Sequence, residues 1–315
     1  MGRTYNGFGI ALAWPQTYCK QTGSWYDAIT AFLGFSVNRY YKVGHAACVL
    51  INKNDGICHY YDFGRYHAPF LHGRVRNINT DNDLHIKTIA IFDEKKEQII
   101  NMDAILTELQ KRESFHGDGV LWAGYTSLNF EKALNKAIHI QNQSPVKYGP
   151  FQYKGTNCSR FVQSVILAGK PAWNHRFKIK FLIPFTPTPI TNIKALNHIK
   201  TKAKPYHFVS ITPSKPSQTQ LKTTLFAPGL PENLTDDAQW LSGEGAGSWF
   251  TLSFSNSILT AQRYNLKGEE ECSGQYKAHE LLENFNIKNY KVSYLSHCNQ
   301  ITLVYENNKL VFYRI

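Results

Sequence analysis

The chain has 315 residues, of which 43% are apolar, so a large core is expected and global disorder is excluded. Its net charge of +12 is unevenly distributed, because residues 132–231 hold 15 Lys and Arg with no Asp or Glu, whereas the remainder holds 20 basic and 23 acidic residues. No run approaches the roughly 18 apolar residues of a membrane span, and the N-terminus lacks the pattern of a signal peptide.

These properties predict a protein without a transmembrane segment, either cytoplasmic or exported without a recognisable signal peptide. The acid-free stretch predicts an electropositive surface that attracts anions. An anionic substrate or a glycopeptide fits such a surface, anionic lipid stays open, and nucleic acid is a weaker alternative. A solvated basic surface without any partner is the plainest alternative.

The first part of the chain alternates between strand and helix patterns. Expected strands cover residues 8–14, 43–51, 57–63 and 84–92, and expected helices cover 25–34, 102–111 and 128–141. The segment Asn54-Asp55-Gly56 separates two of the strands and has the composition of a hairpin turn. A further helix is expected from Asn157, a good N-cap residue, to Gly169, a common C-terminal residue.

The pattern predicts three parts: a first domain over residues 1–182, a Pro- and Lys-rich linker over 183–235, and a small α+β domain over 236–315. In the last part, strands are expected at 249–254, 258–264, 290–295, 301–305 and 310–313, with a helix at 279–285. We expect this domain to select substrates or to bind a protein partner.

The six cysteines form no C-x-x-C pair, and we expect reduced thiols. Histidines at metal-ligand spacing with matched partners are absent, so neither a metal nor a cofactor is expected. Cys158 differs from the other thiols because it falls in the first turn of an expected helix, where unpaired N–H groups stabilise a thiolate. Lys154 and Arg160 add positive charge nearby. Cys158 is therefore the candidate nucleophile.

His45 is the candidate base because it lies inside an otherwise apolar strand, where an unpaired histidine would be costly to bury. A satisfied core histidine is the alternative. A third group should orient the imidazole. A two-residue turn would place His45 on the same face as Tyr60 and Asp62, whereas a three-residue turn would select His59 instead. We favour Asp62 and keep His59 open.

The strand with Gly44-His45-Ala46, its polar hairpin partner and the later Asn157-Cys158-Ser159-Arg160-Phe161 helix together resemble circularly permuted papain-like hydrolases of the NlpC-type superfamily. In that permuted branch the histidine precedes the cysteine, as His45 precedes Cys158 here. The resemblance covers roughly residues 8–170 and implies an α+β fold with an antiparallel sheet plus helices. The segment from 85 to 148 is longer than in a minimal domain of this type.

The resemblance implies a cysteine hydrolase that attacks an amide or ester carbonyl, with His45 as the base and Asp62 as the third catalytic residue. Expected substrate-binding residues are Tyr60, Arg65, Asn157 and Ser159. The favoured function is a bacterial amidase or peptidase acting on cell-wall peptide. Alternatives are a lipid or thioester acyl hydrolase or acyltransferase, disfavoured because no amphipathic anchor is evident, and a non-catalytic binding module on the same scaffold.

Overall fold

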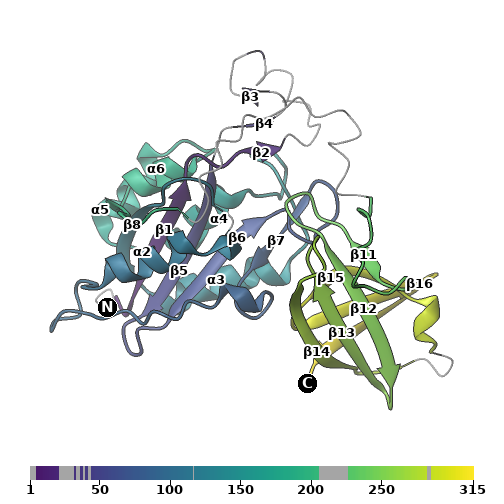
Figure 1. The fold of residues 1–315 in the computed structure, drawn as a ribbon. Helices are drawn as coiled ribbons and strands as arrows, with labels where there is room; N and C mark the ends of the chain where they lie inside the picture. Colours follow the sequence, from purple (N-terminus) through teal and green to yellow (C-terminus); the bar gives the residue numbers. More distant parts are fainter. Residues whose placement is uncertain are drawn as a thin grey trace.

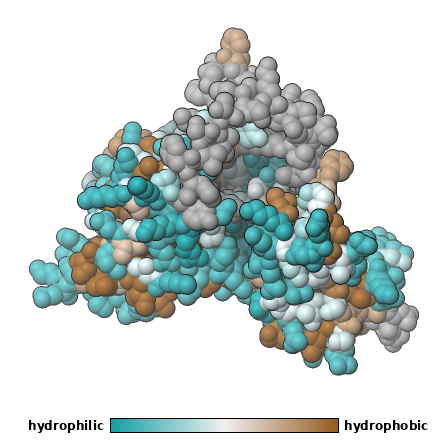
Figure 2. Space-filling view, viewed as in Figure 1, coloured by the Kyte–Doolittle hydropathy of each residue, from teal (hydrophilic) through white to brown (hydrophobic). Residues whose placement is uncertain are grey.

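The computed structural model describes residues 5–20, 32, 36–37, 40–41, 44–115, 117–205, 226–281 and 285–315. Within these residues the chain forms two seven-stranded antiparallel sheets and a small three-stranded one. Helices cover the first large sheet, and the second forms a separate C-terminal domain (Figure 1). Figure 2 shows the same arrangement as two lobes. The α+β class expected from the sequence is confirmed. No helix in the described part is long and apolar enough to cross a membrane.

The first sheet has the strand order β10-β8-β1-β5-β6-β7-β9. Its strands are β1 (Gly7–Trp14), β5 (His45–Asn52), β6 (Cys58–Gly64), β7 (His72–Arg76), β8 (Trp122–Leu128), β9 (Val146–Lys147) and β10 (Asn197–Lys200). The small sheet is β2 (Cys19–Lys20), β4 (Tyr40–Tyr41) and β3 (Ser36–Val37). The central strands β1 and β5 are buried along almost their whole length, which explains their continuous apolar sequences.

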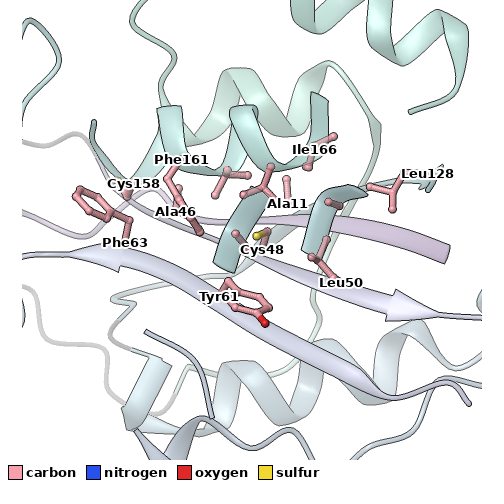
Figure 3. Packing of buried hydrophobic residues seen from close by; sticks show 14 of the residues in the cluster. Ala11, Ala46, Cys48, Leu50, Tyr61, Phe63, Leu128, Cys158, Phe161 and Ile166 are labelled. Atoms are coloured by element: carbon pink, nitrogen blue, oxygen red, sulfur yellow. The ribbon is translucent and has the colours of Figure 1, made fainter. Parts of the chain in front are cut away.

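Helix α2 (Met102–Lys111) packs on one face of this sheet, and α3 (Phe130–Asn142) and α4 (Cys158–Ala168) pack on the other. Large and small side chains alternate along β1, so the two faces of the strand differ in the space that they leave for the helices. Its large side chains, such as Phe8 and Leu12, join the α2 core, whereas Ala11 and Ala13 face α4. Small residues on that face let α4 lie close to the sheet (Figure 3).

Two glycines of β1 extend this small-residue face. A Cβ atom on Gly7 would lie 2.6 Å from the Ile51 carbonyl oxygen and 2.7 Å from Cβ of Phe130, the first residue of α3. A Cβ atom on Gly9 would lie 2.5 Å from a Leu128 methyl carbon. Both positions therefore require glycine for close packing rather than for an unusual backbone angle.

The hairpin between β5 and β6 differs from the expected two-residue turn, because residues 53–57 form a longer loop. The strands nevertheless pair in a register that places His45 on the same face as Tyr60 and Asp62, as expected. Ala47 lies opposite Asp62, and Ile51 lies opposite Cys58. The expected strand at 84–92 is wrong: it contains a short 3-10 helix, η1 (Asn82–Leu84), followed by irregular chain. This irregular segment buries three apolar side chains in the core beside α2: Leu84, Ile86 and Ala90. The sequence therefore alternates between apolar and polar residues as a strand would, although the segment has no partner strand.

The expected helix at 25–34 lies almost entirely outside the described residues. Residues expected to be linker contribute ordered elements to the first domain. After α5 (Trp173–Phe177) and η3 (Lys178–Leu182), helix α6 (Pro189–Lys194) forms, and β10 pairs with β8. Thr188 begins α6 with a capping box, and Pro189 occupies its first turn. The first domain therefore extends at least to Lys200.

The C-terminal domain is β-rich, with the strand order β11-β12-β13-β14-β17-β16-β15. Its strands are β11 (Gln239–Leu241), β12 (Ser248–Ser255), β13 (Ile258–Tyr264), β14 (Glu270–Ala278), β15 (Lys291–His297), β16 (Gln300–Tyr305) and β17 (Asn308–Arg314). Strand β14 was not expected. Residues 279–281 are not helical, and the rest of the expected helix falls partly on 282–284, outside the described residues.

A closed ring of polar side chains, all buried except Glu271, joins the two domains, and we call it the interdomain ring. Its members are His67, Arg74 and Asp81 of the first domain and Ser248, Arg263 and Glu271 of the C-terminal domain. The Asp81 carboxylate accepts hydrogen bonds from Arg74 at 2.7 and 2.9 Å and from Arg263 at 3.2 Å. Arg263 Nε lies 2.9 Å from a Glu271 carboxylate oxygen.

Glu271 closes the ring through Ser248 and His67. The Ser248 hydroxyl donates to Glu271 at 2.6 Å and lies 2.7 Å from His67 Nε2. Because Arg74 can only donate, His67 Nδ1 must accept from it, so the proton of His67 is on Nε2. Burial and the neighbouring Arg263 and Arg74 hold the pKa of His67 well below its usual value. The ring is therefore complete only with neutral His67.

Changing Asp81 to Asn should destabilise the protein, because Arg74 and Arg263 would lose the carboxylate that compensates their buried charges. We expect the free energy of unfolding to fall by about 3–5 kcal/mol. Urea denaturation of the full chain measures it. Asp83→Asn is the matched control, since Asp83 is exposed and its change should cost about 0.5 kcal/mol or less. Equal effects of the two changes would contradict a stabilising role for the ring.

Candidate active site

Helix α4 places Cys158 at its first residue. The Asn157 side chain caps the helix by accepting a hydrogen bond of 2.8 Å from the Arg160 N–H. Phe161, Val162, Val165 and Ile166 bury the other side of the helix against the sheet. The Cys158 side chain lies over Ala46 of β5 (Figure 3) and is 6% exposed. The helix N-terminus thus holds the thiol against the start of the strand that carries His45.

His45 is the first residue of β5 and lies between Cys158 and Asp62. Its Nε2 atom is 3.4 Å from the Asp62 carboxylate, which is an ion-pair distance. Among the described residues, no other group accepts a hydrogen bond from this nitrogen. Nδ1 is therefore the ring nitrogen left for the thiol. Trp14 stacks on the imidazole at 5.8 Å between ring centroids and Tyr66 meets it edge-on at 6.5 Å. The two aromatic rings restrict how the imidazole can rotate.

Asp62 is fully buried and has three partners. Arg76, directly opposite on β7, donates to its two oxygens at 3.0 and 2.6 Å. The Tyr60 hydroxyl donates to it at 3.1 Å, and His45 is the third partner. Burial opposes the charged form, but Arg76 and His45 outweigh burial and hold the pKa of Asp62 below its usual value. Asp62 is therefore ionised at neutral pH.

The electrostatics favour a thiolate–imidazolium pair. Burial lowers the pKa of His45, but Asp62 and Cys158 outweigh burial and raise it to about 9. Burial likewise raises the pKa of the Cys158 thiol, but His45 and the Ala46 N–H outweigh burial, and this pKa lies below its usual value. At neutral pH a proton therefore resides on His45, and the thiol of Cys158 loses its proton more readily than an ordinary thiol does.

A cavity of about 560 Å³ opens beside His45. Tyr18, Arg65, Tyr66 and Asp118 line it from the first domain. Glu244 and Gly245 of the C-terminal domain line it as well. The cavity wall carries both positive and negative side chains.

The C-terminal wall of this cavity is firmly attached. Glu244 pairs with Arg65 at 2.9 Å and accepts a hydrogen bond of 3.3 Å from the Leu71 N–H. The Gly245 N–H donates to the Arg65 carbonyl at 2.8 Å, and the His67 N–H donates to the Ala246 carbonyl at 2.8 Å. The C-terminal domain therefore contributes directly to the shape of the cavity next to His45.

The four expected substrate-binding residues have different surroundings. Arg65 lines the cavity, with its guanidinium 5.1 Å from the Tyr148 ring centroid. Tyr60 is buried with its hydroxyl on Asp62, and Asn157 caps α4. Ser159 is buried, with its hydroxyl 3.9 Å from the Cys158 sulfur.

His59, the alternative third residue, is placed away from the site. It pairs with Leu50 and packs on Phe130, toward the other end of β5 from His45. Arg76 was not among the expected catalytic or substrate-binding residues, although it holds Asp62. No strand was expected at residues 72–76, so no pairing register was available to place Arg76 opposite Asp62.

The other thiols differ from Cys158 in pKa or in access. Burial raises the pKa of Cys19 to about 11 and that of Cys58 to about 12, and it raises the pKa of Cys48 further. A hydrogen bond from Cys272 lowers the pKa of Cys298 to about 7, but Cys298 is fully buried. The described residues contain no cluster of His, Cys, Asp and Glu that could hold a metal ion.

Comparisons with known proteins match both parts of the chain. Residues 9–175 match the family model described as type VI secretion system effector TseH-like, and residues 238–315 match the DUF6695 C-terminal domain. The crystal structure of the type VI secretion system effector TseH is similar at 20% identity and a TM-score of 0.39, over 60% of this chain and 87% of that chain. A search of curated proteins finds no match.

Alkylation by iodoacetamide should single out Cys158. At neutral pH we expect it to react faster than the other five cysteines, because its pKa is lowered, whereas burial raises the pKa of Cys19, the cysteine that lines the cavity with His45. The rate should rise with pH through this lowered pKa. In His45→Ala the midpoint should move to higher pH, because burial then acts on the thiol without the imidazolium. Mass spectrometry of labelled peptides gives the rate at each cysteine. Identical midpoints in the two proteins would contradict the ion pair.

Proposed function

The chain belongs to the TseH-like family of type VI secretion system effectors, and we propose that it acts as a cysteine hydrolase. The observation that carries the proposal is the arrangement of Cys158, His45 and Asp62, with a lowered thiol pKa and a raised imidazole pKa. The position of Cys158 at a helix N-terminus against an antiparallel sheet also supports placing the first domain among permuted papain-like folds.

In the proposed reaction the Cys158 thiolate attacks the carbonyl carbon of an amide. The carbonyl oxygen becomes an oxyanion, and the unpaired N–H groups of the first turn of α4 stabilise it. His45 then gives its Nδ1 proton to the leaving nitrogen, so the C–N bond breaks and an acyl-enzyme remains. Asp62 keeps Nε2 oriented and compensates the charge of the imidazolium.

Deacylation uses the same residues in reverse. His45 is now neutral and takes a proton from a water molecule that attacks the thioester carbonyl. The thioester bond breaks, the Cys158 thiolate leaves, and His45 again holds the proton. Arg76 and Tyr60 fix Asp62 throughout, so the carboxylate cannot turn away from the imidazole.

We propose an amide of bacterial cell-wall peptide as the substrate. The family is described as one of secretion system effectors, and a substrate outside the producing cell fits that description. The cavity supports a substrate of mixed charge, since Arg65 and Arg112 lie in its wall together with Asp118 and Glu244. Such a wall suits peptide stems that carry both amino and carboxyl groups.

Purified peptidoglycan fragments incubated with the full chain should yield new amine ends, detected by mass spectrometry of the products. Cys158→Ala should reduce the rate by at least about a thousandfold, because it removes the nucleophile. Cys58→Ala is the matched control, since Cys58 is a buried thiol at the far end of the β5–β6 hairpin and its loss should leave the rate nearly unchanged. Cleavage that survives Cys158→Ala would refute the proposed nucleophile.

The hydrolysis rate should form a plateau against pH. On the acid side it should decline as Cys158 takes a proton at its lowered pKa. On the alkaline side it should decline near pH 9, where His45 loses the proton that the leaving nitrogen needs. Initial rates in buffers of constant ionic strength measure both limbs. A rate that continues to rise above pH 9 would contradict the role of protonated His45.

A further inference from the structure

An exposed row of large apolar side chains lies on α5 and η3, and we call Trp173, Phe177, Phe181 and Leu182 the aromatic ridge. Trp173 is 66% exposed, Phe181 67% and Leu182 68%. The first three residues are spaced four apart, so they follow one side of the helical segment. His175 and Ile179 are buried on its inner side. The ridge therefore faces away from the core that anchors the segment.

Basic side chains accompany the ridge. Arg176 and Lys180 line a shallow groove of about 180 Å³ with Trp173, Phe177 and Phe181. Lys178 lies in the same segment, within the acid-free residues 132–231. Among the described residues, no carboxylate forms an ion pair with these three cations. The surface thus combines exposed apolar groups with uncompensated positive charge.

The aromatic rings stack on one another rather than lining a deep pocket. Trp173 and Phe177 are stacked with centroids 5.9 Å apart, and Phe177 and Phe181 are tilted at 5.2 Å. Nucleic-acid bases bind to open ring faces, and here neighbouring rings occupy part of those faces. A stable protein interface involves about 20–30 residues on each side, many more than this ridge offers. Apolar edges flanked by cations instead suit a lipid interface.

We propose that the aromatic ridge docks this protein on the surface of an anionic lipid bilayer. The apolar side chains would enter the boundary between headgroups and acyl chains, and Arg176, Lys178 and Lys180 would contact lipid phosphates. No such anchor was evident from the sequence, because α5 and η3 form one short segment between Pro171 and Pro184 and lack a long amphipathic pattern. Helix α5, which carries the first part of the ridge, lies on the side of the first domain away from the C-terminal domain (Figure 1).

Co-sedimentation with vesicles of phosphatidylcholine, with or without phosphatidylglycerol, tests the proposal on the full chain. We expect binding to the anionic vesicles and at least about tenfold weaker binding to neutral ones. Binding should weaken at about 1 M salt, where the Debye length is about 3 Å. The variant W173S/F177S/F181S should lose at least about tenfold in vesicle affinity. Lys178→Gln with Lys180→Gln should reduce the preference for anionic vesicles.

Leu266→Ser is the matched control, since Leu266 is 61% exposed in the C-terminal domain and its change should leave vesicle binding intact. Circular dichroism before sedimentation verifies that each variant is folded. Cys158→Ala should bind vesicles like the unchanged protein, so loss of hydrolysis and loss of docking are separate results. Absence of vesicle binding, or equal binding by the ridge variant, would overturn the proposal and leave an acidic protein partner as the candidate for this surface.

Discussion

The close contact between α4 and the first sheet is the constraint on which the site depends. Ala11, Ala13 and Ala46 present small side chains to the helix, and larger ones there would move Cys158 away from the start of β5 (Figure 3). The apolar side chains of α4 then fix its rotation, so its first residue faces His45. Packing at the level of single methyl groups therefore sets the position of a nucleophile.

The same close packing requires the charges of the site to compensate one another. Cys158, His45, Asp62 and Arg76 form a buried row in which negative and positive groups alternate. An isolated charge at this depth would be costly, whereas an alternating row with hydrogen bonds is tolerated. Arg76 therefore does more than hold Asp62 in place. Without Arg76, the single positive charge of His45 would have to compensate both the Asp62 carboxylate and the Cys158 thiolate.

Local signals in the sequence were enough to predict α4 from Asn157 to Gly169, because capping residues and apolar spacing act within one helix. The face that β6 shares with His45 was also predictable, because the register of two paired strands depends on the one short loop that connects them. Arg76 and Glu244 could not be found in this way. Arg76 depends on a strand whose side chains carry no clear alternation, and Glu244 reaches the cavity only through contacts 179 residues apart in the chain.

The interdomain ring bears on how such a protein can evolve. Domains separated by loose linkers can be exchanged between genes at little cost, because each surface is complete in itself. Here, exchange of the C-terminal domain would leave Asp81 without Arg263 and His67 without Ser248, and it would remove one wall of the cavity. The two domains should therefore be inherited as a unit, and a new partner domain would need to reproduce an Arg, a Ser and a Glu at matching positions.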